Sequence, residues 1–474
     1  MTSNTSADGT DLAQAIQRGD LTASQAMQSS LVAAEAHASI GAIAYRDSTM
    51  GIASAKAMDT ERLSNPAAFA ARSFCGVPTL AKDLGGPFAG LPVSAGSRLF
   101  DRKAGEADSD LAFRFRDAGF CFFGLTTSPE FGLSLASEPA IGPICRNPLD
   151  PTLTAGGSSG GAAAAVASGI VAIAHATDAG GSIRVPAACC GLVGLKPTRG
   201  AIPAGPSFAN HLSGIASELA VCRSARDAAR VFDALRGKAR GPFTDPATAD
   251  INDGRLRVGL LIDTGCQYPT ERARLEAVEA AARALETDGD EIVPLKWIDF
   301  EPGVAASGRA FGDIVSVNLA GLIDALALDE ARAEPLTRAF IERGRTLSAT
   351  SLWNALNGAV LVSRDLWNLF DRVDCILMPM LSFAPLAIGS FPSDHGNTEL
   401  HLDRMTAFAP LASLANISGF PALTLPFGTD ADGLPLPVQI LAPMGHEPLL
   451  LSLAARLEAE ERWQHRFPVA GLAA

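Results

Sequence analysis

Short apolar runs and longer helix-like segments alternate along this chain. The apolar runs predict a turn and then a strand over residues 76–84, buried strands over 121–125 and 170–174, and strands over 257–261 and 375–379. Prolines punctuate a further strand-and-turn region at 419–441. Capping residues and apolar spacing predict helices over 22–37, 109–118, 162–168, 222–236, 270–287 and 447–461. Because the 162–168 helix leads directly into a buried strand, this part of the chain has the order of an α/β crossover.

One long region shows no clear period. Residues 297–400 are rich in aromatic side chains, which would suit an apolar or aryl substrate pocket, although buried aromatic residues more often belong to the core. The Gly-, Pro- and Asp-rich residues 238–255 predict a surface loop. No internal repeat or linker divides the chain, so we expect a single domain over residues 1–474.

Composition narrows the class of protein. The chain has 474 residues, of which 47% are hydrophobic and 19% charged, as is typical of globular rather than disordered proteins. Its formal net charge is −13 and it has no basic stripe, so we expect neither nucleic acid nor an anionic membrane as a partner. Residues 151–177 are uncharged, but their glycine and serine content argues against a membrane-spanning helix.

The eight cysteines and seven histidines form no metal-binding pattern. No Cys-x-x-Cys, Cys/His or H-E-x-x-H spacing is present, so we predict no metal site and expect the histidines to be structural or surface residues. The start of the chain has no positively charged stretch followed by an apolar one. We therefore infer no signal peptide and expect a cytoplasmic, reducing location.

A first glycine-serine cluster spans residues 154–161 and contains Ser158 and Ser159. Residues 156–160 match the G-x-S-x-G pattern of a nucleophile elbow, which requires a buried strand in front of it. The preceding residues 147–152 are polar and broken by proline. On its own, this cluster is equally consistent with a simple loop or an anion-binding turn.

A second cluster, residues 178–184, directly follows a predicted buried strand. Glycine permits a close approach of the backbone to a ligand. The amides of Ala179, Gly180, Gly181 and Ser182 could therefore converge on one oxygen, as an oxyanion hole requires. A tight turn after a strand is the alternative interpretation.

Lys82 is the third candidate, and its neighbours are apolar. In a strand, its side chain lies on the face of Leu80 and Leu84, whereas Asp83 points to the opposite face. A lysine that acts as a general base must be uncharged, and burial away from carboxylates lowers its pKa toward neutrality. The alternative is an ordinary solvated lysine.

Taken together, these residues resemble the amidase signature family. The matching blocks are Gly-Gly-Ser-Ser-Gly-Gly at 156–161, Asp-x-Gly-Gly-Ser-Ile-Arg at 178–184 and Gly-Leu-Val-Gly-Leu-Lys-Pro-Thr-Arg-Gly at 191–200. Weaker matches occur at 126–131, 146–148, 416–422 and 433–435. The resemblance implies an α/β fold in which helices cover both faces of a central mixed, twisted sheet. It places the catalytic core at about 70–200 and a variable pocket region at about 297–400.

The resemblance also implies roles for single residues. Ser182 would be the nucleophile, and Ser158, often preceded by a cis peptide bond, would connect it to the general base Lys82. Gly157, Ser159, Asp178 and Arg184 would support the site or bind substrate, with Arg184 pairing either with Asp178 or with a substrate carboxylate. The implied reaction cleaves the C–N bond of an amide through an acyl-enzyme, with water as second substrate and without metal or organic cofactor. Esters and carbamates are plausible side substrates.

Some positions depart from the family pattern. Ala179 stands where threonine is frequent, Leu125 where lysine is common, Pro437 where glycine is common, and His175 where a small residue is frequent. Residues 187–191 and Gly205-Pro206 resemble, more weakly, the branch that includes the cyclic-dimer hydrolases of nylon oligomers and related aryl acylamidases.

Three alternatives remain open from the sequence. The chain could be the amidase subunit of a glutamine-dependent amidotransferase, which would require partner subunits. It could be a non-catalytic binding protein on the same fold, although the three intact candidates argue against this. It could be an α/β-hydrolase that uses Ser158 with a histidine. A homodimer is an expectation from the family only.

Overall fold

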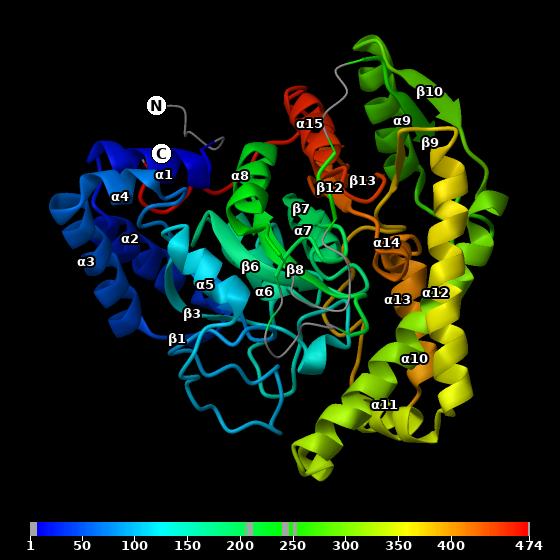
Figure 1. Cartoon of the computed structure of the whole chain (residues 1–474), viewed down its shortest axis with the longest axis horizontal. Coiled ribbons are helices and arrows are strands. Elements are labelled where there is room, and N and C mark those ends of the chain that lie inside the picture. Colours follow the sequence, from blue (N-terminus) through cyan, green and yellow to red (C-terminus); the bar gives the residue numbers. More distant parts are fainter. Residues whose placement is uncertain (1–6, 204, 206–211, 239–245, 250–253, 473–474) are drawn as a thin grey trace.

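A mixed β-sheet lies at the centre of the computed structural model, which describes residues 7–203, 205, 212–238, 246–249 and 254–472 (Figure 1). In these residues eight strands follow the spatial order β10 (Glu291–Pro294), β9 (Arg257–Leu260), β11 (Cys375–Pro379), β13 (Pro435–Leu441), β12 (Ala422–Thr429), β7 (Val193–Lys196), β8 (Ser217–Cys222) and β6 (Ile173–Asp178). The first three are parallel to one another, and each later neighbour is antiparallel. The expectation of a mixed α/β sheet is confirmed.

A second sheet lies beside β6. It has the order β1 (Ile43–Arg46), β3 (Cys121–Thr126) and β2 (Pro78–Lys82), and β2 is fully buried. Within the described residues no backbone ladder joins β2 to β6. Instead, Thr79 Oγ1 donates to the carbonyl of Ile173 over 2.9 Å, and the backbone N–H of Lys82 donates to His175 Nδ1 over 3.1 Å. These side-chain bonds bring the end of β2 to the edge of the main sheet.

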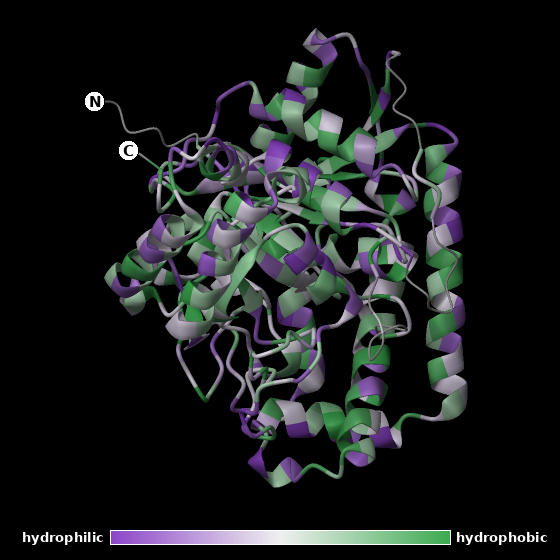
Figure 2. Ribbon diagram, turned by 60° about the vertical axis from the view of Figure 1, so that its left-hand side comes forward, coloured by the Kyte–Doolittle hydropathy of each residue, from purple (hydrophilic) through white to green (hydrophobic). Residues whose placement is uncertain are grey.

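Helices cover both faces of the main sheet (Figure 1). On one face, α6 (Gly160–Ala167) and α7 (Arg184–Cys190) pack on each other and on β6 and β7. On the other, α8 (Ala225–Leu235), α15 (Glu447–Glu458) and α9 (Arg272–Thr287) form a row across β8, β12 and β13. The outer helices carry mixed hydrophilic and hydrophobic residues along their length (Figure 2), as expected for helices with one buried side.

The first part of the chain adds five helices, α1 (Gly9–Arg18), α2 (Ala23–Ala36), α3 (Ser48–Ser64), α4 (Pro66–Ala71) and α5 (Asp110–Asp117). The predicted caps of α2 and α5 are confirmed. The Thr22 hydroxyl accepts the N–H of Gln25, whose side chain accepts the N–H of Thr22 in return. Ser109 accepts the N–H of Ala112 at the start of α5.

The region without a clear period, residues 297–400, is largely helical. It contains α10 (Glu301–Ala325), α11 (Pro335–Thr346), α12 (Ala349–Phe370), α13 (Thr398–Phe408) and, just beyond it, α14 (Ala412–Ser418), on the right of Figure 1. The buried α10 positions Val304, Phe311 and Ile314 do recur at helical spacing. Four glycines inside α10 weaken its intrinsic helix propensity and hide that pattern, so packing stabilises this helix.

Two predicted boundaries are wrong. The strand expected at 170–174 is β6, which begins only at Ile173. Gly169, at φ +76°, lies in the turn after α6, and residues 170–172 connect this turn to the strand. The helix expected at 222–236 is α8, which begins only after Ser224 caps it, since Cys222 ends β8. Most of the loop expected at 238–255, and Pro206 of the Gly205-Pro206 pair, lie outside the described residues.

Core packing and capping predict two stability changes of different size. Leu377 on the central strand β11 is fully buried, so Leu377→Ala should lower the free energy of unfolding by about 2–5 kcal/mol. Thr22→Ala removes the α2 cap and should lower it by about 1 kcal/mol. Urea unfolding followed by circular dichroism at pH 7 measures both, and an equal effect of the two changes would contradict the placement of Leu377 in the core.

Candidate active site

Lys82 ends β2 in a fully buried position. Its Nζ lies 2.7 Å from Ser158 Oγ and 2.7 Å from Thr177 Oγ1. Burial lowers the pKa of Lys82 to about 7, although the negative charges of Glu218 and Asp178 act in the opposite direction. A large share of the molecules therefore carry an uncharged amine at this position near neutral pH.

The carboxylate next to Lys82 in sequence is directed away from it. Asp83 accepts hydrogen bonds from the N–H of Ser94 (2.6 Å) and from its hydroxyl (2.8 Å), and forms an ion pair with Arg102 at 3.0 Å. The alternation of side chains along the strand thus keeps the Asp83 charge from facing the Lys82 amine.

Ser158 lies in the first glycine-serine cluster, which packs tightly against neighbouring backbone. The peptide bond between Gly157 and Ser158 is cis. A Cβ atom at Gly157 would lie 2.6 Å from the backbone nitrogen of Ala136, so no side chain fits there. The Ser159 hydroxyl donates to the Thr177 carbonyl (3.1 Å) and accepts the Thr177 N–H (3.2 Å), which attaches the cluster to β6.

The nucleophile-elbow alternative for Ser158 is wrong. The strand before the cluster, β5 (Asp150–Thr154), belongs to a two-stranded sheet with β4 (Arg146–Asn147) and not to the main sheet, and most of its side chains are at least partly exposed. An α/β-hydrolase would need a central buried strand at this place and a histidine beside the serine. The hydroxyl of Ser158 is instead bonded to Lys82.

The second cluster turns sharply at the end of β6. The Asp178 carboxylate accepts the N–H of Gly181 (2.7 Å) and the N–H of Ile183 (3.1 Å), which folds the turn back on the strand. A Cβ at Gly180 would lie 2.9 Å from the ring of Phe311 on α10, so glycine at this position allows α10 to pack closely against the turn. Because the Gly181 amide is bonded to Asp178, it is not open to a ligand.

Arg184 holds Asp178 from the inside of the molecule. Its Nε and Nη2 each lie 3.0 Å from a different Asp178 oxygen, and its other contacts are Gln439 Oε1 and Asn416 Oδ1, both at 2.7 Å, and the Ala412 carbonyl at 2.9 Å. Arg184 is fully buried, so of its two expected partners it meets Asp178 and not a substrate carboxylate. Burial alone would raise the pKa of Asp178, but Arg184 and Asn416 outweigh it and hold that pKa well below its usual range.

Ser182 is buried, with 7% of its surface exposed. Its carbonyl accepts the N–H of Ser159 at 3.3 Å, which brings the two clusters together. Among the described residues its hydroxyl makes no hydrogen bond, so the Lys82–Ser158 contact is present and a Ser158–Ser182 contact between hydroxyls is not. Hydrogen bonds of this kind are often loose in proteins without a bound substrate.

Several residues of this site were not predicted from the sequence. Thr177 is the second neighbour of the Lys82 amine, and Asn416 donates to the Asp178 carbonyl and carboxylate, each at 2.9 Å. His175, expected to be a structural or surface residue, is buried behind Lys82. Thr177 and His175 are two residues apart on β6 and lie on the same face. A strand predicted at 173–178 would therefore have indicated that both face Lys82.

A cavity of about 670 Å³ lies near the second cluster. Its lining includes Ile314 on α10, Trp367 on α12, and Ile215. Asn416, which also holds Asp178, donates to the carbonyl of Ile215 at 3.0 Å. Ile314 follows, by about one helical turn, the Phe311 that touches Gly180. The volume is in the range that holds small organic ligands.

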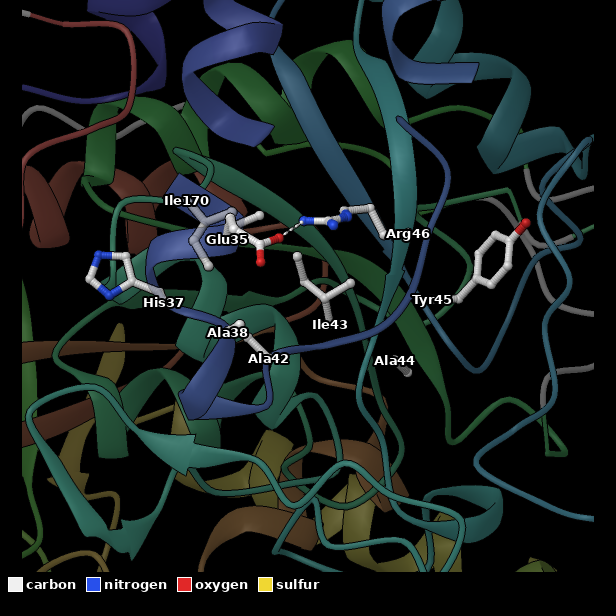
Figure 3. A pocket seen from close by; sticks show the side chains of 10 residues that line it. Glu35, His37, Ala38, Ala42, Ile43, Ala44, Tyr45, Arg46 and Ile170 are labelled. Carbon is white, nitrogen blue, oxygen red and sulfur yellow. Dashed lines mark hydrogen bonds and ion pairs between the residues drawn. The ribbon is translucent and has the colours of Figure 1, made fainter. Parts of the chain in front are cut away.

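A smaller cavity of about 190 Å³ lies at β1 and the end of α2 (Figure 3). Glu35 and Arg46 form an ion pair at 2.9 Å there, and Tyr45 points away from the other side chains. None of the candidate catalytic residues lines it.

Comparison with known proteins assigns the family. A family model described as Amidase matches residues 25–451. The chain belongs to the amidase family. It is 32% identical to AmiC of Mycobacterium tuberculosis over 470 residues, which cover 96% of this chain and 95% of AmiC. It is also 32% identical to the 6-aminohexanoate-cyclic-dimer hydrolase of Paenarthrobacter ureafaciens over 438 residues, or 86% and 87% of the two chains.

Solved structures agree with this assignment. A 6-aminohexanoate cyclic dimer hydrolase in complex with substrate is similar with a TM-score of 0.88 at 26% identity, over 98% of this chain and 99% of that one. A bacterial aryl acylamidase has the same fold with a TM-score of 0.84 at 22% identity, over 96% of each chain. The resemblance to the amidase signature family and to the cyclic-dimer hydrolases is confirmed, and the aryl acylamidase shares the fold.

Metal clusters and membrane-spanning helices are both absent from the described part of this amidase-family chain. Those residues contain no group of three or more His, Cys, Asp and Glu side chains placed to hold a metal ion. They also contain no helix of the length and apolarity that a membrane crossing requires.

The buried Asp178–Arg184 pair predicts a pH-dependent stability change. Arg184→Leu leaves the Asp178 charge buried without its partner and should lower the free energy of unfolding by about 3–5 kcal/mol at pH 7. Because Arg184 depresses the pKa of Asp178, the parent keeps the stability from this pair at pH 4 and loses it only as the pH falls through the depressed pKa. In Arg184→Leu, burial without the partner raises the pKa of the Asp178 carboxyl, so the carboxyl takes up a proton and its buried charge is relieved as the pH falls. The difference between variant and parent should therefore shrink from pH 7 to pH 4.

Urea unfolding at pH 7, 5 and 4 checks this expectation. Arg345→Leu is the matched control, because Arg345 pairs with Asp324 and Glu330 at the surface, and it should change stability little at any of these pH values. A difference for Arg184→Leu that stays constant or grows toward pH 4 would contradict the assigned charge state of Asp178.

Proposed function

We propose that this chain is an amidohydrolase in which Ser182 is the nucleophile, Ser158 the connecting hydroxyl and Lys82 the general base. The observation that carries the proposal is the buried contact of 2.7 Å between Lys82 Nζ and Ser158 Oγ, together with the lowered pKa of the amine, about 7. A base with a pKa near the working pH combines the right protonation state with a useful driving force for proton transfer.

The proton moves through the two hydroxyls in turn. Uncharged Lys82 takes the Ser158 proton while Ser158 takes that of Ser182, whose oxygen attacks the carbonyl carbon. The C–N bond then breaks, and the same path returns the proton to the departing nitrogen. Water, deprotonated in the same way, splits the acyl-enzyme into the carboxylic acid and free Ser182. The first step needs the Ser182 hydroxyl to turn toward Ser158, which a bound substrate would favour.

Backbone amides of the second cluster would stabilise the tetrahedral oxyanion. The amides of Ala179, Gly180 and Ser182 are the donors we propose, and Gly181 supports them by holding the turn on Asp178. Arg184, Gly157 and Ser159 support the turn and the cluster in the same indirect way, through packing and internal hydrogen bonds.

The substrate class we propose is a linear or cyclic carboxylic amide with an apolar part, with esters and carbamates as side substrates. The similarity to hydrolases named for a cyclic amide dimer supports amides, including cyclic ones. The cavity of about 670 Å³ has Trp367, Ile314 and Leu356 in its lining together with polar residues such as Arg199 and Arg364, and its apolar part supports an apolar group. The residues that form or support the site are spread along the sequence from Lys82 to Gln439. This spread supports a single catalytic domain.

Loss of the nucleophile should abolish turnover. Ser182→Ala removes the attacking oxygen, and we expect no product from any member of a panel of aliphatic, aryl and cyclic amides, esters and carbamates. Release of amine or acid by the purified parent protein, with Ser182→Ala as blank, identifies the preferred class. Turnover by Ser182→Ala at the parent rate would refute the assignment.

The pH dependence of the rate should report the Lys82 amine. Because the base must be uncharged, kcat/KM should rise as the pH increases through about 7 and then level off. Lys82→Met should lower kcat/KM by about 10²–10⁴-fold and remove this limb. Lys196→Met is the matched control, since Lys196 is equally buried with a pKa lowered to about 7 but its amine bonds to the Pro197 carbonyl.

The limb near pH 7 should persist in Lys196→Met. If Lys82→Met retains both the rate and the limb, Lys82 is not the base.

Two assays separate the remaining alternatives. A fluorophosphonate should label Ser182 in the parent and not in Ser182→Ala, whereas a non-catalytic binding protein would remain unlabelled. Release of ammonia from glutamine without any partner, but from no other amide of the panel, would favour the amidotransferase subunit over the hydrolase proposed here.

A further inference from the structure

His175 lies directly behind the Lys82 backbone. It projects from β6, is fully buried, and its Nδ1 accepts the backbone N–H of Lys82 at 3.1 Å. Its Nε2 lies 2.8 Å from a carboxylate oxygen of Glu218 on the adjacent strand β8. The imidazole therefore bridges β8 and the last residue of β2, the point at which the reactive amine begins.

These two contacts determine the tautomer of the ring. A backbone N–H can only donate, so Nδ1 of His175 must be the acceptor and carry no proton. The proton is then on Nε2, which donates to the Glu218 carboxylate. His175 is accordingly a neutral imidazole held in one orientation, in the way that a carboxylate orients a histidine in many functional sites.

Packing leaves the ring little freedom. Phe88 and Phe115 lie against it, with ring centroids 4.8 Å and 5.7 Å from the imidazole. The charged groups around Lys82 and His175 are Glu218 on β8 and Asp178 at the end of β6, which Arg184 neutralises. On the other side of β2, Asp83 is paired with Arg102.

We propose that His175, oriented by Glu218, is a positioning residue that sets the place of the Lys82 backbone so that its amine meets Ser158. The reason lies in the missing ladder between β2 and β6 in the described residues. On the side facing β6, the Lys82 N–H donates to the imidazole of His175. On the side facing β3, the next N–H, that of Asp83, donates to the Thr126 carbonyl and continues the pairing of the two strands. A shift of about 1 Å in a catalytic group lowers rates by about 10²-fold, so this one bond is worth testing. The inference rests on the proposed function, in which Lys82 is the base.

Two substitutions separate the two bonds of the ring. His175→Asn places an amide oxygen where Nδ1 was, so it can still accept the Lys82 N–H but cannot reach Glu218. His175→Gln places its amide where Nε2 was, so it can still reach Glu218 but leaves the Lys82 N–H without an acceptor. Both remove the aromatic ring, so they disturb packing to a similar extent.

The expected result is a split between these variants. His175→Gln should lower kcat by about 10- to 100-fold with little change in KM, whereas His175→Asn should stay within about threefold of the parent. Thr79→Val is the matched control: it removes another side-chain bond between β2 and β6, the one to the Ile173 carbonyl, three residues from Lys82. It should lower the melting temperature without changing kcat or the pH profile.

Glu218 gives a second, independent pair of variants. Glu218→Gln keeps an acceptor for His175 Nε2 but removes a charge that favours protonated Lys82, so the acidic limb of kcat/KM should move to lower pH with kcat retained. Glu218→Leu removes the acceptor as well and should lower kcat. This pair is the deciding measurement if the His175 variants do not fold.

Distinct outcomes overturn the inference and the proposed function. If kcat falls equally in His175→Asn and His175→Gln, or follows melting temperature alone across all variants including Thr79→Val, then His175 has only a structural role. Equal kcat in Glu218→Gln and Glu218→Leu would likewise show that the imidazole does not position Lys82. Activity that persists in Lys82→Met in the same assay refutes Lys82 as base, whatever the His175 variants show.

Discussion

The arrangement of the candidate site depends on an amine that is buried without a facing carboxylate. Lowering a lysine pKa from its ordinary value to about 7 corresponds to about 4–5 kcal/mol of lost solvation for the charged form. The fold tolerates this because Lys82 meets two hydroxyls, those of Ser158 and Thr177, which can bond to the uncharged amine. Strand alternation sends Asp83 to Ser94 and Arg102 instead, so the nearest carboxylate in sequence does not restore the charge.

A second buried group in the site is handled in the opposite way. Asp178 keeps its charge because Arg184, Asn416 and the amides of its own turn surround it. That carboxylate shapes the backbone on which Ser182 sits, so the electrostatic work of Asp178 and Arg184 is to hold the loop and not to contact a substrate. The two arrangements are close enough to interact: a buried amine with a lowered pKa and a fully compensated ion pair.

The site assembles from segments that are distant in sequence, and this limits what the sequence can predict. Lys82 and the two serine clusters follow from local motifs. Close neighbours require glycine in the clusters: the backbone of Ala136 at Gly157, and the side chains of Phe311 and Ala412 at Gly180 and Gly181. The partners Asn416 and Gln439 come from α14 and β13, and only the folded chain brings them to Arg184. The apolar run places the start of β6 three residues too early, so His175 falls outside the predicted strand. Its position facing β2 could not be read from the sequence, and it was expected to be a structural or surface residue.

The sequence by itself determined the α/β class, the family and the three candidate residues, because these depend on local patterns: apolar runs, caps and short glycine-serine motifs at fixed positions. Only the tertiary structure decided that residues 301–370 are long helices, that Arg184 is internal and that one amide of the second cluster is already bonded. Packing decides such features, since a helix diluted by glycines is stable only against its neighbours and a buried hydrogen bond needs a partner from elsewhere in the chain.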